Sequence, residues 1–319
     1  MQKPAGHTDK NSQNSWKYLL FLIILGFIGY LLAPEIRFYA DKAYYGATDY
    51  FDSRPKKYVL FIGNSRTFYY DMPGIVRKIA DSAGSKNLYI IEQHTTPGGQ
   101  LEDHLASPKL QKLLQNDWDE IVIQGGGPEN YQPLMREQFY QNGEALIAMV
   151  KSTNPVPKLF LSWAFAREEY DIYNREHKEW FENSYLPWYQ YMVETGFPEK
   201  DRRIIDIYTP DFYPYDQANH FRNMQIDYIR LAQMTGAEVV NIGQAAESLR
   251  HSAPSYEQLT IDATHPTIQV SYLTALMFFA AFEKTNDVSA VSYIPSGVSE
   301  KEGKHIRNIV NSYLQGMKQ

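Results

Sequence analysis

The chain has 319 residues, of which 44% are hydrophobic and 21% charged, so it can form one sizeable globular domain with appendages. Its formal net charge of −6 gives no basic field that would attract nucleic acid. It contains no cysteine, which excludes disulfides, a thiol nucleophile and a zinc site with cysteine ligands.

The first predicted element is a membrane span at residues 16–34. Its central run, residues 18–33, has no charged side chain. The run is slightly short for a hydrocarbon core of about 30 Å, but Trp16 and Lys17 can extend it at the interface. A cleaved signal peptide is the alternative, and it requires small residues before the cleavage point, where Leu31 stands here. We therefore expect an uncleaved anchor.

The orientation of this anchor follows from the lysines that precede it. Lys3, Lys10 and Lys17 are a small basic excess, which favours a cytoplasmic N-terminus. Residues 1–15 are then a cytoplasmic tail and residues 35–57 a short stem. The rest of the chain is expected outside the cytoplasm, on the periplasmic side of a cell inner membrane that the chain crosses once.

Beyond the stem, short apolar runs alternate with helical patterns. The runs predict strands at 58–62, 88–92, 121–124, 159–163 and 238–242. Helical spacing is found after Asp71, over 105–114, around 139–150, before Gly236 and from Pro266 to about 282. This alternation indicates a five-stranded parallel sheet covered on both faces, in a domain spanning 58–285. Residues 286–319 are expected to add a helix that packs on the domain, opened by a capping box of Ser299 and Glu302.

Residues 166–218 interrupt this rhythm with an aromatic-rich insertion. Thirteen of them are aromatic, and the segment follows the fourth strand, where doubly wound sheets border their sites. The insertion can form a lid or ligand wall, or a small helical subdomain packed by its own aromatic side chains. The two interpretations are compatible.

Two polar motifs are expected at the same edge of the sheet. Ser65 follows the first strand in Gly63-Asn64-Ser65, and Asp262 precedes His265 by three residues after the fifth strand. An aspartate at this spacing can orient an imidazole that serves as base for a serine nucleophile. Taken alone, Asp262 could instead cap the helix that Pro266 opens, but the shared edge favours a catalytic triad.

Acyl transfer also needs hydrogen-bond donors for the oxyanion. Gly98 and Gly99 follow the second strand, and Gln124 with glycines 125–127 follows the third. Glycine allows a backbone N–H to approach a ligand closely.

These blocks resemble the SGNH/GDSL hydrolase superfamily from about residue 58 to 284. Gly63-Asn64-Ser65 matches its nucleophile block, Gly98 or Gly99 its oxyanion glycine, and Asp262 with His265 its last block. The resemblance implies a flavodoxin-like three-layer α/β/α fold and serine esterase or acyltransferase chemistry. The chain lacks the asparagine of the third block; Gln124 is the expected replacement, and Asn130 a more distant one.

The resemblance points to an extracytoplasmic serine esterase that acts on O-acetyl esters of envelope carbohydrate. One alternative is an O-acyltransferase of an envelope polysaccharide that works with a membrane acyl-donor partner. The other is a non-catalytic glycan-binding or assembly subunit on the same scaffold. We expect no metal, because the histidines lack ligand spacing, and no nucleotide cofactor, because glycines 125–127 lack a phosphate-binding motif.

Overall fold

The computed structural model describes residues 49–125, 133–152, 155–163, 167–196, 216–262 and 264–316. The chain divides into two compact units, Met1–Arg54 and Pro55–Gln319, and the sheet belongs to the second. The predicted tail, most of the stem and the span at 16–34 lie outside the described residues. Within the described ranges, no helix is long and apolar enough to cross a membrane.

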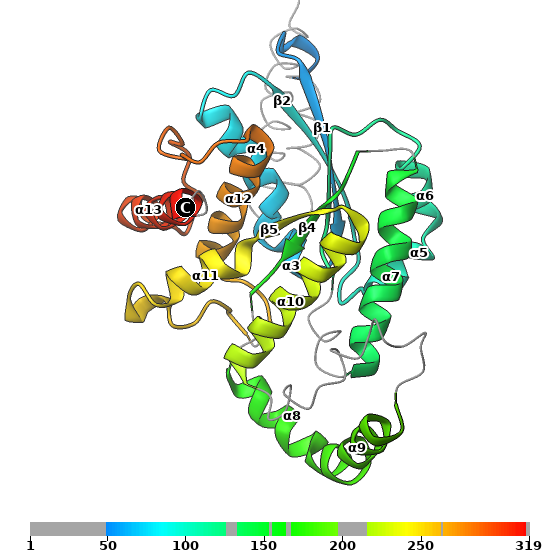
Figure 1. The fold of residues 1–319 in the computed structure, drawn as a ribbon. Helices are drawn as coiled ribbons and strands as arrows, with labels where there is room; N and C mark the ends of the chain where they lie inside the picture. The colour runs from blue at the N-terminus through cyan, green and yellow to red at the C-terminus, as the bar shows by residue number, and fades with distance from the viewer. Residues whose placement is uncertain are drawn as a thin grey trace, which may run out of the picture. The chain divides into compact units, whose positions relative to one another are not determined.

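A five-stranded parallel sheet forms the centre of the second unit (Figure 1). Its order is β2-β1-β3-β4-β5, and every neighbouring pair is parallel. The strands are β1 (Lys56–Gly63), β2 (Leu88–Thr95), β3 (Glu120–Ile123), β4 (Lys158–Leu161) and β5 (Glu238–Asn241). The five predicted strands are confirmed, and their carboxyl ends meet at one edge because all run in the same direction.

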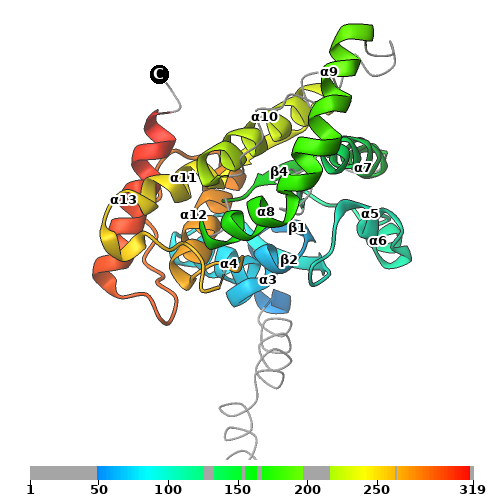
Figure 2. The same cartoon turned by 90° about the horizontal axis from the view of Figure 1, so that it is seen from below.

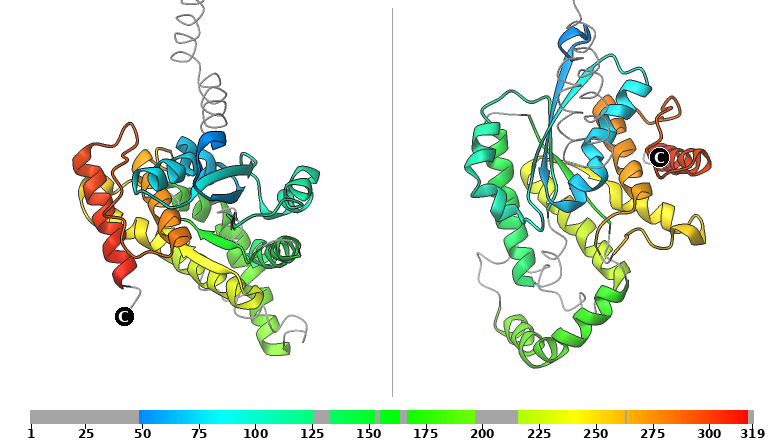
Figure 3. Two further views of the ribbon diagram at one scale, coloured as in Figure 1. Left: turned by 90° about the horizontal axis from the view of Figure 1, so that it is seen from above. Right: turned by 180° about the vertical axis from the view of Figure 1, so that it is seen from behind.

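Alternate residues of β1 face two separate cores. Val59 and Phe61 pack under one helical layer, whereas Leu60 and Ile62 pack under the other. The first layer consists of α4 (Met72–Ser82), α11 (Ile242–Arg250), α12 (Ile268–Glu283) and α13 (Glu300–Gly316). The second consists of α5 (Leu101–Leu105), α6 (Pro108–Leu113), α7 (Pro133–Lys151) and α10 (Gln217–Thr235). Figures 2 and 3 show the two layers on opposite faces of the sheet, so the α/β/α prediction is confirmed.

Two helix boundaries differ from the prediction, each because of a local backbone feature. The helix expected over 105–114 is two helices, since Pro108 starts α6 and Ser107 caps it. Pro266 does not open α12; Thr267 is its N-cap and accepts from the N–H of Val270 at 3.3 Å. The helix expected after Asp71 is confirmed: Asp71 is the N-cap of α4, with a left-handed φ of 52° and no side-chain cap hydrogen bond.

The C-terminal helix α13 begins with the predicted capping box. Ser299 N–H donates to Glu302 Oε2 at 2.8 Å, and Glu302 N–H donates to Ser299 Oγ at 3.3 Å. Ile306 and Val310 of α13 are completely buried against the first layer. The capping box therefore starts a helix whose apolar stripe joins the core.

The described part of the insertion is helical. It contains α8 (Arg167–Trp180), a π-helical turn (Phe181–Tyr185) and α9 (Leu186–Thr195). The ring of Tyr185 lies 5.4 Å from that of Trp180 and 5.7 Å from those of Phe181 and Trp188. These side chains pack on one another, as one of the two interpretations expects. Residues 197–215 lie outside the described part of the chain.

Candidate active site

The predicted nucleophile lies at the start of a short helix. Gly63 ends β1, Asn64 is the N-cap, and Ser65 is the first residue of α3 (Ser65–Phe68). Asn64 Oδ1 accepts from the N–H of Arg66 at 3.1 Å, and Asn64 Nδ2 donates to the carbonyl of Gly99 at 3.0 Å. The buried asparagine thus fixes the serine turn and ties it to the loop that follows β2.

Gln124, the residue directly after β3, supports this turn. Its Oε1 accepts from the N–H of Asn64 at 2.9 Å and from the hydroxyl of Thr67 at 3.1 Å. One N–H of its amide donates to the carbonyl of Gly125, and the residue is only 1% exposed. Gln124 therefore holds the serine turn through its oxygen, and its role as an oxyanion donor stays a prediction.

Glycine is required at the end of β1 because α3 begins immediately above it. A Cβ on Gly63 would lie 2.4 Å from Thr67 Oγ1 and 2.8 Å from Gln124 Oε1. Both distances are far shorter than van der Waals contact, so a larger residue would displace the serine turn.

Gly98 and Gly99, in the loop after β2, differ in backbone conformation, burial and hydrogen bonding. Gly98 has a φ of 65° and is exposed, whereas Gly99 is buried and donates its N–H to Thr96 O at 2.9 Å. The N–H of Gly99 is therefore used within the turn in this arrangement, and its role as an oxyanion donor stays a prediction. Gly125 N–H is likewise engaged, with the hydroxyl of Tyr228 at 3.2 Å. Among the described residues, the N–H groups of Gly98 and Ser65 make no hydrogen bond.

Asp262 and His265 meet as the sequence predicts. Asp262 Oδ2 lies 2.7 Å from His265 Nδ1, and Asp262 Oδ1 accepts from the N–H groups of His265 at 2.8 Å and Thr264 at 3.0 Å. Burial alone would raise the pKa of Asp262, but these hydrogen bonds outweigh it and hold the pKa well below its usual range. The carboxylate is therefore ionised and fixes the imidazole tautomer with Nδ1 protonated.

The alternative role for Asp262 as a helix cap is wrong. Thr267 caps α12, and the segment between Leu259 and Thr267 closes into a loop before the helix begins. Ile261 N–H donates to His265 O at 2.9 Å, and Thr260 pairs with Pro266 in an isolated bridge. The loop presents the Asp–His pair.

The imidazole of His265 lies against the segment that follows Ser65. It stacks on the ring of Tyr69, with centroids 4.4 Å apart and planes 15° from parallel. Tyr69 begins η1 (Tyr69–Asp71), the 3₁₀ turn directly after α3. No hydrogen bond joins Ser65 to His265 among the described residues, so the predicted contact is not formed in this state. Catalytic hydrogen bonds commonly tighten only when substrate binds.

Arg66 also belongs to the site, although no sequence motif indicates it. Its guanidinium donates to Ser162 Oγ at 2.6 Å and to Trp163 O at 2.8 Å, and it lies 5.4 Å from the Trp163 ring. Arg66 is 4% exposed. It ties the helix that carries Ser65 to the end of β4, a contact that no local sequence pattern indicates.

Two buried histidines lie beside the loop that carries Gly98. His94 is the last but one residue of β2, and His104 belongs to α5, with ring centroids 5.3 Å apart. Their ring nitrogens are buried without hydrogen-bond partners. Burial, then the neighbouring His94, lowers the pKa of His104 to about 4. Both rings are therefore neutral near pH 7.

A second serine–histidine pair lies between the end of α11 and α13. Ser252 Oγ is 2.7 Å from His305 Nε2, and the hydroxyl also donates to the carbonyl of Leu249 at 2.7 Å. The single hydroxyl proton is then directed at a carbonyl, so His305 has none to remove. The ring of Tyr256 stacks on the imidazole of His305, with ring centroids 5.5 Å apart. This pair is a structural contact and supplies a matched control for Ser65.

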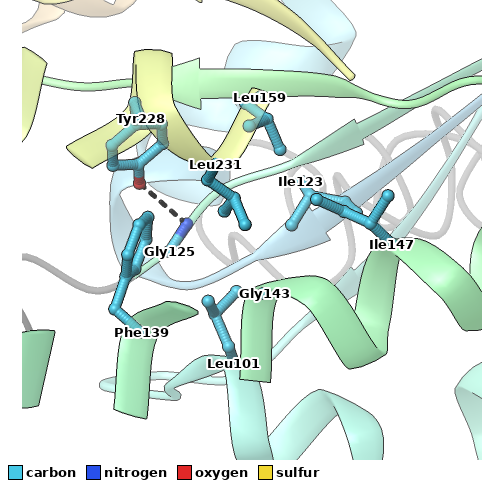
Figure 4. A pocket seen from close by; sticks show the side chains of 9 residues that line it. All are labelled: Leu101, Ile123, Gly125, Phe139, Gly143, Ile147, Leu159, Tyr228 and Leu231. Atoms are coloured by element: carbon cyan, nitrogen blue, oxygen red, sulfur yellow. Dashed lines mark hydrogen bonds between the residues drawn. The ribbon is translucent and has the colours of Figure 1, made fainter. Parts of the chain in front are cut away.

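A small cavity lies between α7, α10 and the sheet (Figure 4). Its volume is about 10 Å³ and its lining is apolar, with Leu101, Phe139 and Leu231 among the side chains. It has room for no more than one water molecule, so it is a packing void and not a substrate pocket.

The site thus combines a serine at the start of a helix after β1 with Asp-x-x-His before α12, on a parallel sheet in the order β2-β1-β3-β4-β5. No family model matches the sequence, and no curated protein does. A protein of the DUF4886 family from Bacteroides uniformis matches in structure, at 15% identity and a TM-score of 0.57, over 83% of this chain and 96% of that one.

Two solved esterases align less closely. A psychrotrophic esterase from Pseudoalteromonas sp. matches at 13% identity and a TM-score of 0.44, over 72% of this chain and 97% of its own. An acetylxylan esterase from Geobacillus stearothermophilus matches at 13% identity and a TM-score of 0.40, over 76% of this chain and 96% of its own. The fold is shared with the Bacteroides uniformis protein. At these identities the likeness concerns the fold and not the reaction.

Proposed function

We propose that this chain is a serine esterase that cleaves acyl esters through an acyl-Ser65 intermediate. The observation that carries the proposal is the 2.7 Å contact between Asp262 Oδ2 and His265 Nδ1. The imidazole of this pair stacks on Tyr69, four residues beyond Ser65. A carboxylate, an imidazole and a serine at one sheet edge are the groups that nucleophilic acyl transfer needs.

The reaction proceeds in two steps. His265 Nε2 takes the proton of the Ser65 hydroxyl while Oγ bonds to the ester carbonyl carbon, and the carbonyl oxygen becomes an oxyanion. The carbon–oxygen bond to the alcohol then breaks, and the alcohol leaves with the proton from His265. Water attacks the acyl-serine in the same way, giving its proton to His265 and releasing the carboxylic acid and free Ser65. Asp262 stabilises the imidazolium in both steps without accepting its proton.

The backbone N–H groups of Ser65 and Gly98 are the donors we assign to the oxyanion. The N–H groups of Gly99 and Gly125 donate to Thr96 O and to the hydroxyl of Tyr228. An oxyanion hole of backbone donors does not require the asparagine that the third sequence block lacks.

Exposure of the site favours hydrolysis over transfer. The side chain of Asp262 is 52% exposed and that of His265 29%, so water can reach an acyl-serine. For the substrate we propose O-acetyl groups on envelope carbohydrate, with the domain held outside the cytoplasm by the predicted span at 16–34. The support is the family resemblance of the motifs together with the apolar run. An acyltransferase with a membrane acyl-donor partner uses the same residues, and product analysis separates it from an esterase.

The decisive experiment is labelling of the full chain by a fluorophosphonate. The wild type and Ser252→Ala are expected to be labelled equally, and Ser65→Ala is expected to remain unlabelled. Acetate release from O-acetylated polysaccharide, with and without an added glycan acceptor, then distinguishes hydrolysis from transfer. A folded wild-type protein that is neither labelled nor active on any ester contradicts the proposal and favours a non-catalytic glycan-binding subunit.

A further inference from the structure

Tyr69 connects the two halves of the candidate site. Its ring is nearly parallel to the imidazole of His265, at 4.4 Å between centroids. Phe68 stacks beside Tyr69 at 6.3 Å, and Tyr70 meets it edge-on at 5.6 Å. The aromatic ring therefore belongs to the segment that also carries Ser65, and it holds a histidine that is far away in the sequence.

The backbone around Tyr69 is shaped to leave its ring in this place. The short helix α3 ends at Tyr69, whose ψ of 137° is not helical. Tyr70 and Asp71 follow with φ values of 54° and 52°, which are unfavourable for residues with a Cβ. Two such residues in succession persist only where the surrounding contacts hold them, and such strain is concentrated at functional sites.

His265 needs a second restraint besides Asp262. The pair lies on a loop, and the carboxylate contacts only one edge of the ring, at Nδ1. A single contact at the edge fixes the tautomer but leaves the ring able to tilt about it, which would redirect Nε2. A face contact restrains the plane of the ring. The electron-rich face of a tyrosine also attracts the imidazolium that forms when His265 takes the serine proton.

We propose that Tyr69 is a positioning residue for His265: its ring fixes the plane of the imidazole, so that Nε2 points at Ser65, and stabilises the imidazolium. The role rests on the proposed esterase function. It requires the ring of Tyr69 and not its hydroxyl, and this requirement makes it testable.

The test compares Tyr69→Leu and Tyr69→Met, which remove the ring, with Tyr69→Phe, which keeps it. Tyr58→Leu is the matched control, because Tyr58 lies near the start of β1 and is 39% exposed. The readouts are the rate of fluorophosphonate labelling of Ser65, kcat and KM for p-nitrophenyl acetate, and the NMR signal of the His265 Cε1 proton. Circular dichroism identifies folded variants, and the two ring-less substitutions guard against one failing to fold.

Loss of the ring is expected to lower kcat and the labelling rate by about tenfold, with KM nearly unchanged, because the base is misaligned while the binding surface is kept. The His265 signal is expected to lose the upfield displacement caused by the tyrosine ring. Tyr69→Phe and Tyr58→Leu should match the wild type in every readout.

Two results overturn the positioning role. One is wild-type labelling and kcat in a folded ring-less variant, and the other is a loss in Tyr69→Phe as large as in Tyr69→Leu. Failure of the esterase function itself is recognised separately, because the wild type is then labelled no better than Ser65→Ala. That result overturns both proposals.

Discussion

Acidification is expected to destabilise the domain through His104, a buried histidine that takes no part in the proposed chemistry. Its side chain has no exposed surface, and burial followed by the nearby His94 lowers the pKa of His104 to about 4 from its ordinary 6.5. A histidine with a lowered pKa is neutral in the folded state and binds a proton first in the unfolded state. The stability that neutral His104 contributes to the folded state is therefore complete above about pH 6.5, and it is lost progressively as pH falls towards 4.

The size of the effect follows from the distance between the two pKa values. Each unit of pH within this window removes up to about 1.4 kcal/mol from the free energy of unfolding. At pH 5, which is about 1.5 units below the ordinary value, the loss is about 2 kcal/mol. Burial also lowers the pKa of His94, which adds to the loss in the same direction.

Urea unfolding followed by tryptophan fluorescence at pH 7.5 and pH 5 measures this loss. His104→Leu is the comparison, because an apolar side chain in the same buried place does not titrate. The variant should lose about 2 kcal/mol less than the wild type between the two pH values, whatever its absolute stability. Carboxylates with lowered pKa values, such as Asp262, lose their stabilising effect only at lower pH. Their effect is the same in the wild type and in His104→Leu, so it cancels in the comparison. Equal losses in the two proteins would refute the argument.

Three further outcomes are expected. Ser65→Ala and His265→Ala should each abolish most turnover of a small acetyl ester, and the double variant should be little worse than either, because neither residue works without the other; additive losses in kcat/KM contradict a triad. Gln124→Ala should lower the free energy of unfolding by about 1–3 kcal/mol, because it leaves the buried donors of Asn64 and Thr67 without their acceptor; denaturant titration checks this, and unchanged stability contradicts the structural role of Gln124. Gly63→Ala should reduce both stability and Ser65 labelling, since its Cβ would lie 2.4 Å from Thr67 Oγ1; a labelling rate equal to the wild type shows that the turn tolerates the methyl group.

The sequence by itself determined the strand architecture and the pairing of Asp262 with His265. Apolar runs of strand length that alternate with helical spacing placed all five strands, because a strand buried on both faces must be apolar throughout. The Asp-x-x-His spacing predicted the contact between Asp262 and His265, since residues three apart in one loop can face each other. The capping box of α13 was readable for the same reason, because its partners are neighbours in the chain.

Only the tertiary structure decided which groups are engaged and which remain available. Gln124 Oε1 is held by the serine turn that follows β1, and this contact depends on the register of β1 with β3. Arg66 with Ser162, and Tyr69 with His265, join segments from separate strands and loops. Local patterns encode periodicity and spacing, whereas such pairings depend on how strands and loops are arranged in space, and that arrangement exists only once the sheet has formed.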